Sequence, residues 1–97
     1  MYAAVRRYEG VTDSKEVAWQ VEEHFLPIIS EMPGFVAYYV VDAGDGVMVS
    51  TSVFEHQDAE EQSSWKAGQF TAEHIASLSP NPPQITAGDV VAHKKSN

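Results

Sequence analysis

The chain has 97 residues, of which 43% are hydrophobic and 10% aromatic, a composition typical of one globular domain rather than of a disordered segment. Fourteen acidic residues oppose six basic ones, and the formal net charge of -8 argues against nucleic acid or an anionic membrane as a partner. The absence of cysteine excludes disulfides, thiolate metal sites and a cysteine nucleophile.

The sequence favours a cytoplasmic location. It contains no apolar run long enough to span a bilayer. Its first residues also lack the charged-then-apolar order of a secretory signal. We therefore expect a cytoplasmic protein.

The first third of the chain predicts a strand and then a helix. The strand runs from Tyr2 to Glu9 and ends at Gly10. Asp13 and Glu16 have the spacing of a capping box, and the helix extends from Ser14 to about residue 32. At about 100° per residue its apolar face contains Ala18, Val21, Phe25, Ile28, Ile29 and Met32. Pro27 lies toward the opposite, wet side and predicts a kink.

Two further strands, a second helix and a last strand follow. The strands run from Phe35 to Asp42 and from Val47 to Phe54, joined by a hairpin turn at residues 43–46. Asp58 is expected to cap a helix that ends near residue 78. Its sheet-facing side is expected to contain Ala59, Ser63, Ala67, Phe70, His74 and Leu78. The last strand runs from Ile85 to His93, so residues 1–93 form one domain and residues 94–97 a disordered tail.

This order predicts an α+β, ferredoxin-like βαββαβ fold, with a four-stranded antiparallel sheet and both helices on one face. The second strand is apolar on both sides. One side carries Phe35, Ala37, Tyr39 and Val41, and the other carries Val36, Tyr38 and Val40. Because the helices cover one face only, we expect a second copy of the chain to cover the other, giving a homodimer through the sheet faces.

Short motifs support a more specific resemblance. Met32-Pro33-Gly34-Phe35 precedes Tyr38-Tyr39, Asp45-Gly46 occupies the hairpin, and Val53-Phe54-Glu55 precedes the second helix. With these motifs the chain, from about residue 2 to residue 93, resembles the antibiotic biosynthesis monooxygenase-like (ABM) domains of the dimeric α/β-barrel superfamily. The resemblance implies a dimeric α/β barrel. Domains of this type include cofactor-independent oxygenases of aromatic polyketides, haem-degrading monooxygenases and proteins of no known activity.

The haem-degrading members are similar in having a tryptophan and a histidine on the second helix and an asparagine on the first strand. Trp65 and His74 are nine residues apart, which places them on nearly opposite sides of a helix. The first strand contains no asparagine. Haem degradation is therefore disfavoured.

Five residues are candidates for chemistry. His74, at the centre of the sheet-facing side of its helix, is a candidate acid or base. Tyr38 and Tyr39 face opposite sides of the sheet, and one of them would orient a phenolic substrate. Arg6 and Arg7 also face opposite sides, so one points into a covered region. Each residue also has a structural interpretation: a satisfied histidine, tyrosines that supply apolar bulk, and an arginine paired with Glu55 or Asp89.

The sequence predicts no cofactor and no metal site. No two histidines are four residues apart, and the acidic pairs Glu22-Glu23 and Glu60-Glu61 are typical of solvated helix faces. Two functions remain open. The first is a cofactor-independent monooxygenase that acts on a small aromatic or enolisable substrate. The second is a non-catalytic module of the same fold that binds a small hydrophobic ligand or supports assembly.

Overall fold

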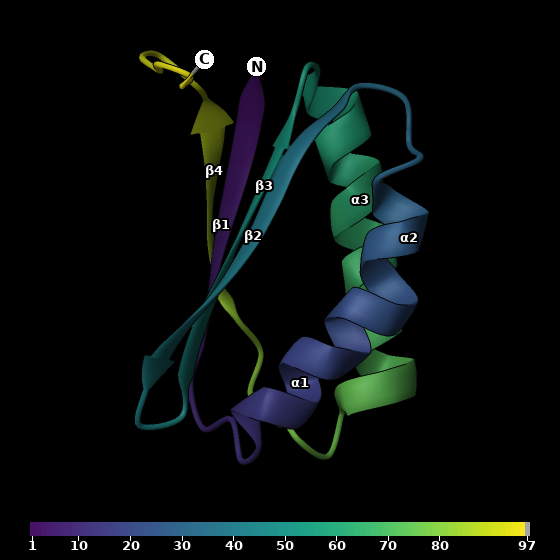
Figure 1. The fold of residues 1–97 in the computed structure, drawn as a ribbon, viewed down its shortest axis with the longest axis vertical. Coiled ribbons are helices and arrows are strands. Elements are labelled where there is room, and N and C mark those ends of the chain that lie inside the picture. The colour runs from purple at the N-terminus through teal and green to yellow at the C-terminus, as the bar shows by residue number, and fades with distance from the viewer. Residues whose placement is uncertain (97) are drawn as a thin grey trace.

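Four strands form one antiparallel sheet in the computed structural model, which describes residues 1–96 (Figure 1). The strands are β1 (Tyr2–Tyr8), β2 (Phe35–Gly44), β3 (Val47–Phe54) and β4 (Gln84–Asp89). Their order across the sheet is β2-β3-β1-β4. All three neighbouring pairs are antiparallel, with Arg6 of β1 opposite Ser50 of β3 and Ile85 of β4. The predicted ferredoxin-like fold is confirmed.

Two helical segments cover one face of this sheet (Figure 1). The first comprises α1 (Ser14–Gln20), the π turn η1 (Val21–Phe25) and α2 (Leu26–Ile29), and the second comprises α3 (Gln57–Phe70) and the π turn η2 (Thr71–Ile75). The predicted cap of the first segment is confirmed, because the Asp13 carboxylate accepts a hydrogen bond from the Glu16 N–H at 3.1 Å. The predicted cap of the second is wrong. That helix begins at Gln57, so Asp58 lies in its first turn, where a negative charge also stabilises the helix.

The π turns change which side chains face the sheet. A π turn contains more residues than an α-helical turn, so it rotates every later side chain relative to a regular helix. In the first segment the buried residues are Val17, Val21, Phe25 and Ile29. Ile28, predicted to face inward, is 51% exposed. In the second segment Ile75 takes the inward place after Phe70, and His74 is exposed. The predicted sheet-facing position of His74 is therefore wrong.

A bulge at the start of β2 reverses the predicted facing of Phe35 and Val36. The register of β2 against β3 shifts between Phe35 and Ala37. Phe35 consequently points to the helices, where its ring meets that of Phe54 at 5.7 Å between centroids, and Val36 is 43% exposed. Beyond the bulge the alternation is as predicted: Tyr38 packs against the core, and Tyr39 is exposed.

The last strand is shorter than predicted. It ends at Asp89 rather than His93, because Tyr2, its partner there, is the first residue of β1. Residues 90–96 have no regular structure, and Asn97 lies outside the described residues. The domain boundary at residue 93 and the disordered tail stay predictions. Within the described part of the chain, none of the helices has the length and apolar character needed to cross a membrane.

Candidate functional site

An apolar cavity lies between the helices and the sheet. We call it the helix–sheet cavity, and its volume is about 40 Å³, room for a few water molecules. Its walls come from three strands, both helical segments and two loops. They are formed by Tyr8, Val11, Val17, Val21, Phe25, Tyr38, Val40, Met48, Val49, Ser50, Ala67, Phe70, Thr71, Ile75 and Ser79.

Two phenol groups are the main polar features of this cavity. Burial raises the pKa of Tyr8 and of Tyr38, and the nearby Arg6 guanidinium opposes both shifts without cancelling them. A phenol with a raised pKa stays protonated at neutral pH. Both side chains can therefore donate a hydrogen bond to an oxygen atom inside the cavity.

Two buried hydroxyl groups, of Ser50 and Ser79, line the same cavity. The Ser50 hydroxyl is close enough to Tyr38 to oppose the rise of its pKa. Even so, neither Ser50 Oγ nor Ser79 Oγ makes a hydrogen bond of normal geometry with any residue from 1 to 96. A buried polar atom without a partner is costly. These two atoms are therefore available to a ligand or to water.

A second hollow makes Tyr38 accessible from outside. We call it the β2-edge groove. It has a volume of about 290 Å³ and lies between the first helical segment and β2. Four residues line both the groove and the helix–sheet cavity, namely Val21, Tyr38, Val40 and Met48. The groove approaches the size of ordinary small-molecule sites, about 300–1,000 Å³, whereas the cavity alone does not.

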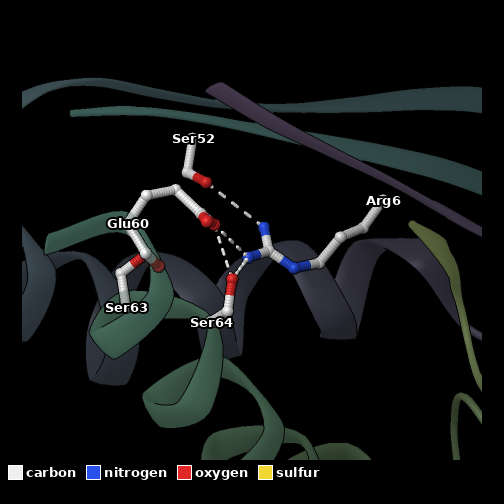
Figure 2. Close-up of polar contacts among 5 residues, drawn as sticks. All are labelled: Arg6, Ser52, Glu60, Ser63 and Ser64. Carbon is white, nitrogen blue, oxygen red and sulfur yellow. Dashed lines mark hydrogen bonds and ion pairs between the residues drawn. The ribbon is translucent and has the colours of Figure 1, made fainter. Parts of the chain in front are cut away.

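Arg6 points toward the helices, where its charge is neutralised (Figure 2). Its guanidinium lies 3.0 Å from the Glu60 carboxylate, and both side chains are at most 4% exposed. Arg6 also donates to the hydroxyl groups of Ser52, at 3.3 Å, and of Ser64. The Ser64 hydroxyl in turn donates to the Glu60 carboxylate at 2.5 Å. We call these four residues the Arg6 network.

The Arg6 network decides between the two interpretations of the arginines. Arg6 is the inward member of the pair and acts as a paired structural arginine, but its partner is Glu60 rather than Glu55 or Asp89. Arg7 is exposed and lies 3.4 Å from Glu9. The prediction of a solvated Glu60 is wrong. Glu60 lies three residues before Ser63, which is buried, and residues three apart share a helix face. This spacing could have predicted that Glu60 is buried.

Of the five predicted site residues, the structure places one in the cavity wall. That residue is Tyr38. Tyr39 is 62% exposed and borders the β2-edge groove, and His74 is exposed on the second helical segment. Sequence reasoning missed Tyr8 and Ser50. Both could have been found from strand alternation, because Tyr8 shares the face of Arg6 and Ser50 lies opposite Arg6.

Nothing in the described part of the chain forms a ready metal site. Residues 1–96 contain no group of three histidine or carboxylate side chains placed to hold an ion.

Comparison with known proteins shows similarity at the level of structure. No family model and no curated protein matches the sequence. NE2512, a protein of unknown function from Nitrosomonas europaea, superposes with a TM-score of 0.75 at 18% identity, covering 99% of this chain and 94% of its own. SnoaB, a cofactor-independent oxygenase from Streptomyces nogalater, gives a TM-score of 0.72 at 18% identity, covering 95% and 94%.

A ligand-bound enzyme has the same fold. The monooxygenase ActVA-Orf6 of Streptomyces coelicolor, in complex with nanaomycin D, gives a TM-score of 0.72 at 19% identity, with 99% of this chain and 92% of that chain covered. At such low identity the similarity concerns the fold alone. This chain has the fold of the antibiotic biosynthesis monooxygenase-like proteins.

Proposed function

We propose that this protein binds a small planar hydrophobic molecule between its helices and its sheet and oxidises it as a cofactor-independent monooxygenase. The observation that supports this most directly is the pair of half-buried phenols, Tyr8 and Tyr38, which stay protonated in a mostly apolar cavity. Such a cavity favours an apolar ring system and gives its oxygen atoms a hydrogen-bond donor. Cofactor-independent oxygenation by the structurally similar SnoaB supports the reaction class.

The proposed reaction needs dioxygen and an enolisable substrate. A ring methylene group conjugated with a carbonyl, as in an anthrone, loses a proton to a water molecule, and the resulting enolate reduces dioxygen. One oxygen atom ends in a new carbonyl at that carbon and the other leaves as water, so that one methylene group and one dioxygen molecule become one carbonyl group and one water molecule. Tyr38 would donate a hydrogen bond to the enolate oxygen, where negative charge develops. Tyr8 would hold a second oxygen of the substrate.

Substrate entry is proposed through the β2-edge groove. The helix–sheet cavity alone is too small for a multi-ring substrate, whereas the groove is wider and shares Tyr38 with it. Leu26 lies at the groove and packs against the core. A ligand that displaces this side chain would join the two hollows.

An oxygen-uptake assay with anthrone-type substrates tests this proposal. Tyr38→Phe removes one hydroxyl group and should lower kcat/KM by about tenfold or more, since it removes a donor to the developing anion. Tyr2→Phe removes a phenol that lies outside both hollows and serves as the matched control. Equal activity of Tyr38→Phe and the wild type would contradict the assigned role of Tyr38.

The second candidate is a non-catalytic module that binds a small hydrophobic ligand. The volume of the helix–sheet cavity, about 40 Å³, favours it, because the resting site holds little more than water. Saturable binding of the same aromatic compounds with no oxygen uptake would support this function over the first.

We further propose that two copies of the chain pack through their outer sheet faces. Tyr39, Val41 and Val5 on that face are 62%, 53% and 38% exposed. The half-buried Val47, Val49 and Val53 lie between them on β3. Monomers rarely expose a continuous apolar surface of this kind, and a second copy would cover it. The cytoplasmic location stays a prediction.

A further inference from the structure

The two π turns bring two histidines together outside the helix–sheet cavity. His24 is the fourth residue of η1 and His74 the fourth residue of η2. Their rings stack with centroids 5.0 Å apart and planes 10° apart. The His74 ring also stacks on the Phe70 ring, and the centroids of these two rings are 5.1 Å apart. Trp19 meets His24 edge-on at 5.8 Å.

This aromatic stack borders a hollow between the two helical segments, which we call the helix groove. Its volume is about 120 Å³, and its walls include His24, His74, Ile28 and the buried rings of Phe25 and Phe70. An apolar cavity of about 150 Å³ is enough to hold benzene in a protein. The helix groove therefore has room for most of one aromatic ring.

Two opposite charges border the helix groove. Lys66 of α3 and Glu73 of η2 both line it. A positive and a negative group therefore face the same hollow. In a chain of net charge -8, an anionic ligand needs a local cation, and Lys66 supplies it.

We propose that the helix groove is a second ligand site, specific for a planar aromatic carboxylate that carries a hydrogen-bond donor, such as a phenol hydroxyl, opposite the carboxylate. The ring packs against Ile28 and the edges of the Phe70, His24 and His74 rings, which line the groove. The carboxylate pairs with Lys66, and the donor at the far end bonds to Glu73. This site uses none of the polar groups of the helix–sheet cavity.

An NMR titration with 4-hydroxybenzoate tests the proposal on the intact chain. The resonances of His24, His74 and Phe70 should shift together and saturate with one dissociation constant. Lys66→Met and Glu73→Gln should each weaken binding by up to about fivefold, the range of an exposed charge interaction. Lys15→Met and Glu31→Gln, which alter exposed charges outside the groove, should leave the affinity unchanged.

Two related compounds define the specificity. 4-Hydroxybenzamide removes the negative charge and benzoate removes the donor, so both should bind more weakly than 4-hydroxybenzoate to the wild-type protein. The difference for the amide should disappear in Lys66→Met. The difference for benzoate should become smaller in Glu73→Gln, where a neutral amide oxygen replaces the carboxylate as acceptor.

Several results would overturn the proposal. They are the absence of saturable shifts, equal affinity of Lys66→Met and the wild type, or shifts centred on Tyr38 and Ser50, which would place the ligand in the helix–sheet cavity. Tyr38→Phe separates this site from the proposed monooxygenase. That variant should show the lowered kcat/KM for oxygen uptake and retain 4-hydroxybenzoate binding in the helix groove.

Discussion

The buried ion pair of Arg6 and Glu60 makes a prediction at the scale of single residues. Glu60→Ala would leave the guanidinium charge buried without its carboxylate, and the free energy of unfolding should fall by about 3–5 kcal/mol. Urea denaturation measures this loss. The double variant Arg6→Met, Glu60→Leu removes both charges and should be more stable than Glu60→Ala. A double variant as unstable as the single one would show that the loss has another cause.

The buried tyrosines predict how stability changes at alkaline pH. Burial raises the pKa of Tyr8 and Tyr38 in the folded chain, so above the ordinary phenol pKa the folded state retains protons that the unfolded state releases. Their stabilising effect is complete below that value and is lost as the pH rises through the raised pKa. Denaturation at pH 8 and pH 11 should show a smaller alkaline loss for Tyr38→Phe than for the wild type. Tyr2→Phe, as the control, should lose as much as the wild type.

Part of the candidate site could be predicted at this scale. Strand alternation separates Arg6 from Arg7 and Tyr38 from Tyr39, because neighbouring side chains point to opposite faces. Alternation does not show which of the two sheet faces the helices cover. It also does not identify the helix residue that pairs with Arg6. That partner depends on how α3 is rotated against the sheet, a property of tertiary packing. The sequence alone therefore predicts that Glu60 lies on a solvated helix face.

The π turns make a prediction at the scale of the elements. Deleting Ala72, an exposed residue of η2, would turn the π turn into an α-helical one and leave Ile75 four residues after Phe70, still facing the sheet. The melting temperature by circular dichroism should change little. Deleting the exposed Gln62 within α3 is the matched control. This deletion rotates the part of the helix after residue 62 by about 100°, which turns its buried side chains away from the sheet. It should therefore lower the melting temperature strongly. Equal loss in both variants would contradict this account of η2.

The order of the elements was predictable, but the rotation of the helices was not. Turn residues, caps and two-residue alternation are local signals, and they predicted four strands and two helical segments in the observed order. A constant 100° per residue fails after a π turn, which is why His74 was expected in the cavity and Ile75 was not. The bulge at Phe35 and Ala37 had the same effect on β2. Neither irregularity can be predicted from the local spacing of apolar residues.

At the scale of the whole molecule, the outer sheet face decides the state of assembly. The helices lie on the opposite side, so within a single protomer the outer face remains exposed to water (Figure 1). Its centre is β3, which has a strand on each side, and the outward residue Thr51 of β3 lies between Tyr39 of β2 and Val5 of β1. If a second copy covers this face, Thr51 lies in the middle of the interface.

Thr51→Lys tests this arrangement, because a lysine at the centre of an apolar interface loses its hydration without gaining a partner. Light scattering should give twice the mass of the single chain for the wild type and the mass of one chain for Thr51→Lys. Ile28→Lys, at a 51% exposed position on the helical layer, should remain dimeric and controls for an added positive charge. A wild-type protein that is monomeric at every concentration, or a dimeric Thr51→Lys, would exclude assembly through this face. Retained oxygen uptake in a monomeric variant would then place the whole catalytic site within one chain.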